Sequence, residues 1–117
     1  MIHLKRVYEP ASTDDGFRIL VERLWPRGLS KSRAQVDLWL KDIAPSPQLR
    51  TWYGHELAKW EEFQRRYRAE LQNNAAVAQL QQLQQDKPII TCVYAARDTE
   101  HNSVLVLKAF LEEHPQL

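Results

Sequence analysis

The 117-residue sequence has little of several residue types that commonly build a scaffold or a reactive centre. Its one cysteine, Cys92, excludes an internal disulfide and favours a reducing, cytoplasmic compartment. Neither His55 nor His101 falls in an H-x3-H or HExxH pattern, so no metal site is predicted. The net charge of +1 provides no whole-chain argument for nucleic-acid binding. We therefore expect a cytoplasmic protein without a metal or other cofactor.

Long apolar runs are also missing. No run approaches the ~20 residues needed to cross a bilayer. The first ten residues, MIHLKRVYEP, are too short and too charged for a secretory signal. No membrane association is predicted, and residues 1–117 are expected to form a single domain that buries roughly two thirds of the unfolded surface.

An apolar stretch that ends in a tight corner is the most informative part of the sequence. Residues 18–28 read RILVERLWPRG. The Ile, Leu and Val residues predict a buried strand over 17–25, and the proline and glycine of WPRG then turn the backbone. Strict alternation would place Arg23 and Trp25 on one face of this strand.

Periodicity predicts the remaining elements. Alternating and continuous apolar runs indicate strands, and apolar residues at three- and four-residue spacing indicate helices. The expected strands are 2–8, 17–25 and 88–95, and the expected helices are 32–43, 46–53, 57–71, a Gln-rich segment after Asn74 to residue 85, and 102–113. This order predicts an α/β fold: a small, mainly parallel sheet with helices on both faces.

The ends of three predicted strands point to a site. They lie at Tyr8, at the WPRG corner and at residues 94–97, and parallel strands bring such ends to one edge of the sheet, where open α/β sheets bind ligands. The last strand also leads to a helix N-terminus near Asn102, which attracts anions. Ten of the sixteen basic residues are arginine, which suits bidentate binding of oxyanions.

The expected site therefore binds an anion such as a phosphate, a nucleotide or a carboxylate. Arginines would hold the charge, tyrosine and tryptophan would stack or shape the pocket, and His101 or His55 would carry a proton if a reaction takes place. The predicted ligand-binding residues are Tyr8, Arg23, Trp25, Arg27, Gly28, Tyr94, Arg97 and Asn102.

Other interpretations of the same residues stay open. The arginines can instead form structural salt bridges, with Trp25 filling the core; the available partners are Asp14, Asp15, Glu22 and Asp98. Cys92 and Arg97 have the C-x4-R spacing of a thiolate loop, although the intervening residues contain no glycine and a buried, inert cysteine is favoured.

Nucleic-acid or partner binding without catalysis is the alternative function, although interleaved acids make it the less favoured one. A basic surface would combine with tryptophan platforms that stack on bases. The residues available for it are Lys5, Arg6, Arg23, Arg27, Lys31, Arg33 and Arg50, with Trp25, Trp39 and Trp52. A monomer and a homodimer are both compatible with four tryptophans.

Four motifs also resemble a known family: KRVYEP, DGFRILVERLWPRG, WLKDIAPSPQLRTWYGH and VYAARDTEHN. In order and spacing, over nearly the full chain, they are similar to the YeaO-like branch of domain-of-unknown-function family 488. The resemblance implies a small α/β protein without an assigned function. The family pattern falls on Arg6, Tyr8, Arg23, Trp25, Pro26, Arg27, Gly28, Trp39, Lys41, Pro45, Ser46, Leu49, Arg50, His55, Tyr94 and Asn102.

The last motif departs from the family pattern. This chain has Asn102-Ser103-Val104 where the family turn is closer to Asn-His-Ala, so His101 is the only histidine in this turn. A Cys-His-Arg cluster of more distant members is missing here, and their chemistry is not transferred.

Overall fold

The structure is a computed structural model of the chain, and it describes residues 2–114. Four strands form one sheet in the order β1-β4-β2-β3, and all three pairings are parallel. The strands are β1 (Ile2–Arg6), β2 (Phe17–Leu20), β3 (Leu38–Trp39) and β4 (Ile90–Tyr94). The predicted parallel sheet is confirmed, and the described sheet has one strand more than predicted.

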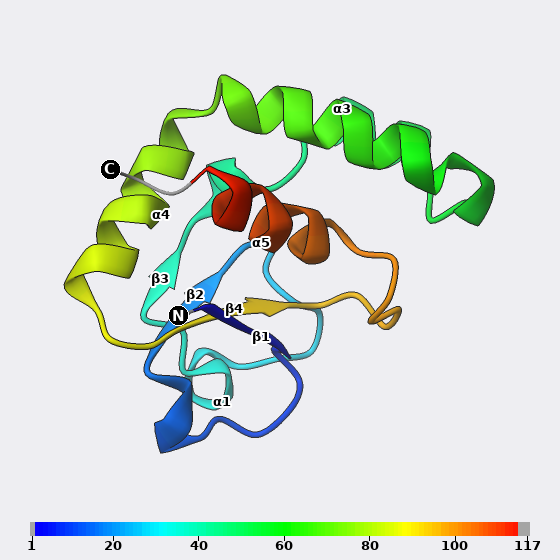
Figure 1. Cartoon of the computed structure of the whole chain (residues 1–117). Helices are drawn as coiled ribbons and strands as arrows, with labels where there is room; N and C mark the ends of the chain where they lie inside the picture. Colours follow the sequence, from blue (N-terminus) through cyan, green and yellow to red (C-terminus); the bar gives the residue numbers. More distant parts are fainter. Residues whose placement is uncertain (1, 115–117) are drawn as a thin grey trace.

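Strand β4 lies at the centre of the sheet between β1 and β2 (Figure 1). Ile90 pairs with Ile2 on one side and with Phe17 on the other. All five residues of β4 are buried. An uninterrupted apolar run is what a strand covered on both faces requires, so the interpretation of residues 88–95 as a central strand is confirmed.

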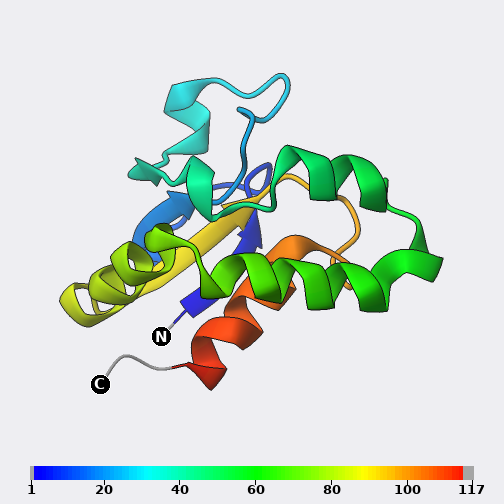
Figure 2. The ribbon, with the colours of Figure 1, turned by 90° about the horizontal axis from the view of Figure 1, so that it is seen from above.

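Helices cover the two faces unequally (Figures 1 and 2). One face carries the main core, to which four helices contribute: α2 (Pro47–Tyr53), α3 (Trp60–Gln72), α4 (Ala75–Asp86) and α5 (Ser103–Glu113). The other face carries a smaller cluster under the short helix α1 (Lys31–Ala34) and the segments beside it. Three single 3-10 turns, η1 (Thr13–Asp15), η2 (Lys41–Ile43) and η3 (Leu57–Lys59), complete the described elements.

Capping side chains set the helix boundaries near the site. The Ser46 hydroxyl accepts a hydrogen bond from the Leu49 amide at 3.2 Å and begins α2, which ends at Gly54 with φ 53°. The Asn102 side chain accepts from the Leu105 amide at 3.0 Å and begins α5. The predicted short helix and the predicted last helix are confirmed.

The prediction of one helix over residues 32–43 is wrong. Helix α1 ends at Ala34 because Gln35 has a left-handed backbone, with φ 47°. The buried Arg18 guanidinium donates to the carbonyls of Ala34 and Gln35, and the Arg18 amide donates to the Asp37 carboxylate. These bonds turn the chain back toward the sheet, where β3 pairs with β2.

The first two strands are shorter than predicted. Strand β1 ends at Arg6, and β2 ends at Leu20 instead of residue 25. The Glu22 carbonyl accepts a hydrogen bond from the Trp39 indole at 2.6 Å, so it is occupied by a side chain rather than by another strand. Trp25 packs with the smaller cluster, whereas Ile19 belongs to the main core on the other face, so the predicted alternation through this segment is wrong.

No helix within residues 2–114 is long and apolar enough to span a membrane.

Candidate functional site

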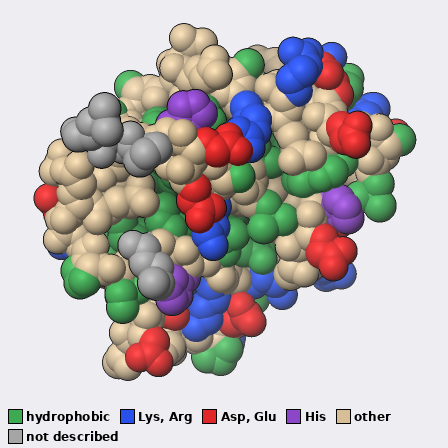
Figure 3. Space-filling model, in the orientation of Figure 1, with side chains coloured by type: hydrophobic (Ala, Val, Ile, Leu, Met, Phe, Trp, Pro, Cys, Tyr) green, Lys and Arg blue, Asp and Glu red, His purple; other side chains and the backbone are tan. Residues whose placement is uncertain are grey.

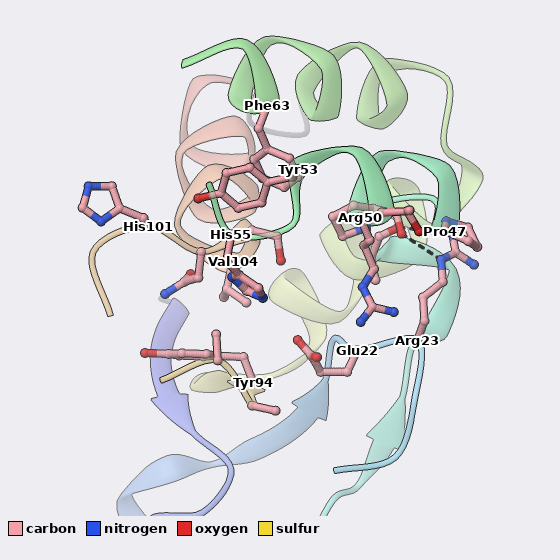
Figure 4. A pocket seen from close by; sticks show the side chains of 17 residues that line it. Glu22, Arg23, Pro47, Arg50, Tyr53, His55, Phe63, Tyr94, His101 and Val104 are labelled. Atoms are coloured by element: carbon pink, nitrogen blue, oxygen red, sulfur yellow. Dashed lines mark hydrogen bonds between the residues drawn. The ribbon is translucent and has the colours of Figure 1, made fainter. Parts of the chain in front are cut away.

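A pocket of about 530 Å³ lies at the carboxyl edge of the sheet (Figure 4). Residues 22–23 follow β2, residues 94–96 are the last residue of β4 and the two after it, and residues 101–104 are the first two residues of α5 and the two before it. The remaining lining residues come from the stretch 44–55, which contains α2, and from Phe63 of α3. The pocket thus occupies the edge at which parallel α/β sheets bind ligands.

The pocket brings together half of the ten residues named from the sequence. Arg23, His55, Tyr94, His101 and Asn102 line it. The other five are not among its lining residues: Tyr8, Trp25, Arg27, Gly28 and Arg97.

The WPRG corner is held by contacts of its own. The Trp25 indole donates to the Leu29 carbonyl at 2.6 Å and packs edge-on against Trp39, with ring centroids 5.5 Å apart. The Tyr8 hydroxyl donates to the Arg27 carbonyl at 2.9 Å. Gly28 has φ 76°, a conformation that favours glycine. The tryptophan in this corner packs as a structural residue.

Arg23 lines the pocket, but its guanidinium is already engaged. It donates to the carbonyl of Pro45 at 2.9 Å and to that of Ala44 at 3.2 Å. A carboxylate oxygen of Asp42 lies 3.7 Å from it. These bonds hold the segment before α2 against the end of β2, so this arginine shapes the pocket.

Arg50 also lines the pocket, although it is not among the ligand-binding residues predicted from the sequence. Its side chain is exposed, extends from α2 into the pocket and makes no hydrogen bond or close ion pair with any residue from 2 to 114 (Figure 4). The sequence signal available for it was its place in the family motif, three residues before Tyr53 on the same short helix. Arg50 is therefore the positive charge available to a ligand.

Glu22 faces the same part of the pocket (Figure 4). Burial raises the pKa of its carboxyl, and the nearby Arg50 charge and the Ala95 backbone act in the opposite direction. The pocket thus contains a partly buried acid close to its free cation.

An aromatic wall closes another side of the pocket. Tyr53 is 5% exposed and stacks on Phe63 with ring centroids 4.4 Å apart. Its hydroxyl is buried and has no hydrogen-bond partner among residues 2–114. Burial, together with the charge of Asp98, raises the pKa of this hydroxyl, so it remains neutral at physiological pH.

The two predicted proton carriers have different surroundings. His101 places Nδ1 3.1 Å from an Asp98 carboxylate oxygen and packs edge-on against Trp60, with ring centroids 5.4 Å apart. A backbone hydrogen bond from Glu100 and the contacts with His101 hold the pKa of Asp98 below its usual value. His55 has φ 58°, an uncommon conformation for a residue with a side chain.

The remaining candidate chemistry finds little support in the described structure. Cys92 is 1% exposed, and burial raises the pKa of its thiol to about 12, which leaves little thiolate at neutral pH. Within residues 2–114, no three His, Cys, Asp or Glu side chains are grouped so that they could hold a metal ion.

Comparison with known proteins identifies the family. A family model described as "Inactive DUF488-N3 subclade" matches residues 1–116. The chain belongs to the DUF488 family. It is 41% identical over 111 residues to the uncharacterised protein YeaO of Escherichia coli K12, covering 94% of this chain and 96% of that protein. The predicted membership of the YeaO-like branch is confirmed.

A second relative has the same level of identity to this chain. The uncharacterised protein Rv3073c of Mycobacterium tuberculosis H37Rv is 41% identical over 110 residues, covering 94% of this chain and 92% of that protein. No solved structure matches the chain.

The DUF488 motif positions divide between the pocket and its support. Those that line the pocket are Arg23, Pro45, Arg50, His55, Tyr94 and Asn102. Ser46 caps the helix that presents Arg50, and Trp39 binds the carbonyl of Glu22. The WPRG corner and Arg6 lie outside the lining, and Arg6 donates to the carbonyls of Ala95 and Ala96.

The basic surface considered for nucleic acid is partly engaged within this DUF488 chain. Lys5 pairs with Asp15 at 3.1 Å, and the guanidinium groups of Arg6 and Arg23 bind backbone carbonyls. On the face shown in Figure 3, acidic and basic side chains are interspersed. That face shows no continuous positive stripe of the kind that phosphate backbones favour.

Proposed function

We propose that the protein binds a small anionic ligand of the phosphate or nucleotide-like class in the pocket at the carboxyl edge of the sheet. The observation that carries the proposal is the exposed Arg50 guanidinium, which has no close partner among residues 2–114 and extends into this pocket. A planar cation with five donors suits bidentate contact with an oxyanion.

The first turn of α5 supports the same ligand class. Asn102 caps the Leu105 amide, and Ser103 and Val104 line the pocket where the helix begins. Backbone amides at a helix N-terminus and the helix dipole favour negative charge. Arg50 and the start of α5 thus contribute positive potential from two different elements.

The proposal concerns binding and assigns no reaction. The matching family model is described as an inactive subclade, which favours a binding role over a catalytic one. Tyr53 contributes a buried hydroxyl without a hydrogen-bond partner among residues 2–114 and a ring stacked on Phe63, and such features suit a site that orients a ligand.

Thermal melting of the purified protein tests the proposal. The panel is inorganic phosphate, sulfate, mono- and dinucleotides, sugar phosphates and short oligonucleotides. A ligand at a hundredfold excess over its Kd stabilises the native state by ~2.7 kcal/mol. We expect one phosphate-containing class to raise the Tm of the wild type and to lose at least about tenfold in affinity with Arg50→Gln, since charged hydrogen bonds contribute ~1.5–3 kcal/mol.

Arg27→Gln is the matched control, because Arg27 is exposed and does not line the pocket. The control should retain the wild-type response. A panel without any shift, or equal losses in the two variants, would remove the pocket as the binding site. A shift with oligonucleotides alone, falling steeply with salt, would support the nucleic-acid alternative instead.

A further inference from the structure

Glu22 and Arg50 have opposite charges and line the same pocket, but they do not form a close ion pair. Arg50 reaches from α2 toward the carboxylate of Glu22 (Figure 4), and the two interact electrostatically. No ion pair within 4 Å joins Arg50 to any carboxylate of residues 2–114. The Arg50 guanidinium therefore remains available to a ligand, and the Glu22 carboxylate, on which the Ala95 backbone also acts, faces the same space.

The backbone holds Glu22 in this position. Its carbonyl accepts the Trp39 indole at 2.6 Å, two residues after β2 ends. The next residue, Arg23, is fixed to the carbonyls of Ala44 and Pro45. Both contacts lie on the main chain or the neighbouring residue, and the Glu22 carboxylate faces the pocket beside the backbone of Ala95.

A bare anion bound to Arg50 would lie near this negative carboxylate and be repelled by it. A ligand that carries a hydrogen-bond donor next to its anionic group avoids this cost, because the donor binds the carboxylate while the anion binds the guanidinium. Glu22 and Arg50 together thus distinguish ligands by the chemical group that lies beside the ligand's anionic group.

We infer that Glu22 is a specificity-determining residue that accepts a hydrogen bond from a hydroxyl or amino group adjacent to the ligand's phosphate. The inference rests on the proposed function, since it assumes that an anion occupies the space beside Arg50. The ligand class it names is a phosphate ester with a nearby donor group, in preference to inorganic phosphate or an apolar ester.

Three esters of similar size test this inference: propyl phosphate, which has no donor, glycerol 3-phosphate, which has hydroxyl donors, and 3-aminopropyl phosphate, which has an amino donor. Their Kd values are measured by NMR titration of backbone amide shifts, which detects millimolar binding. The wild type should bind at least one donor ester about tenfold more tightly than propyl phosphate, the size expected of a charged hydrogen bond. Whichever donor ester gains identifies the donor as hydroxyl or amino.

Glu22→Gln should reduce the difference in affinity between the two kinds of ester. Propyl phosphate should bind more tightly, because the repulsion is removed, and the preference for the donor ester should fall to about twofold or less. Glu61→Gln, an exposed carboxylate of α3 outside the lining, should change neither value. The Tm of each variant checks that it is folded.

Two failures are distinguishable. If the esters bind through Arg50 but Glu22→Gln leaves their relative affinities unchanged, Glu22 does not read the donor and the inference is overturned. If no ester binds the wild type, or if Arg50→Gln binds every ester as tightly as the wild type does, the proposed function fails and this inference fails with it.

Discussion

Replacing Asp15 by alanine should destabilise the fold strongly, because it removes the acid that faces a buried guanidinium. The side chain of Arg18 is 4% exposed and lies 2.6 Å from an Asp15 carboxylate oxygen. The same carboxylate also accepts from Lys5 at 3.1 Å and from the Ser12 amide at 2.9 Å. Three donors on three segments thus depend on one side chain.

The expected loss in free energy of unfolding follows from how deeply each partner of Asp15 is buried. Breaking a buried ion pair by removing one partner costs about 3–5 kcal/mol. Arg18 keeps its bonds to the carbonyls of Ala34 and Gln35, so the lower end, about 3 kcal/mol, is expected. The Lys5 side chain is 21% exposed, and replacing it with methionine should cost at most about 1 kcal/mol.

Urea unfolding followed by tryptophan fluorescence measures these free energies of unfolding. Asp14→Ala is the control, because Asp14 is an exposed acid on the same turn. A loss below about 1 kcal/mol for Asp15→Ala, or one equal to that of the Lys5 variant, would refute the assignment of Asp15 as the essential partner of Arg18.

The same carboxylate should give a pH dependence. Burial acts to raise the pKa of Asp15, but hydrogen bonds from Ser12, Lys5 and Arg18 outweigh it and hold the pKa below its usual 3.8. A lowered pKa in the folded state stabilises the protein above the unfolded value, and this stabilisation is lost as the pH falls through the folded value. The free-energy gap between wild type and Asp15→Asn should therefore shrink below about pH 4.

Two further substitutions test packing, each with a matched control and both measured by urea unfolding. Tyr53→Phe should leave the free energy of unfolding unchanged or raise it by up to about 1 kcal/mol, because the removed hydroxyl has no partner within residues 2–114. Its control, Tyr67→Phe, loses a buried 2.6 Å hydrogen bond to a backbone carbonyl and should lower the free energy of unfolding by about 1–2 kcal/mol. A clear loss for the first variant would show that its hydroxyl is bonded. Gly16→Ala should lower the free energy of unfolding by at least about 2 kcal/mol, because φ is 63° and an added Cβ would lie 2.4 Å from the Ile89 carbonyl oxygen. Its control, Gly28→Ala, has φ 76° but open space around the added Cβ, and should lower the free energy of unfolding by about 1 kcal/mol. Equal costs for both glycines would contradict the close approach at Gly16.

Elements with a sustained periodic pattern could be predicted from the sequence. The apolar stripe of α3 (Phe63, Tyr67 and Leu71) is buried, as its spacing predicts. The continuous apolar run of β4 is likewise a central strand. The pattern of α3 is long enough for burial of one face to determine its conformation, and the run of β4 is long enough for burial of both faces to do so.

The segment 32–43 shows where such reasoning fails. Val36, Trp39, Leu40 and Ile43 have helical spacing, yet they extend over a strand of two residues and a 3-10 turn. Periodicity cannot reveal a two-residue strand, and the bonds from Arg18 that redirect this chain come from a residue distant in sequence. Tertiary contacts override local preference here.

The location of the candidate pocket was more predictable than its side chains. Parallel strands imply a crevice at their carboxyl edge, and the pocket lies there. Which arginine remains free is a question of three-dimensional contacts. Arg23 is engaged by carbonyls of the segment before α2, and Arg50 is presented by the orientation of α2. Neither relation can be read from charge or spacing.

The central place of β4 has a consequence for synthesis and for truncated chains. Strands β1 and β2 do not pair with each other, and each bonds to β4, which starts at residue 90. During translation, most of the chain therefore exists before its first two strands can be joined, and until then both present unpaired edges. A fragment that stops before Ile90 should be prone to aggregation, and refolding of the complete chain should be slowed by these long-range pairings.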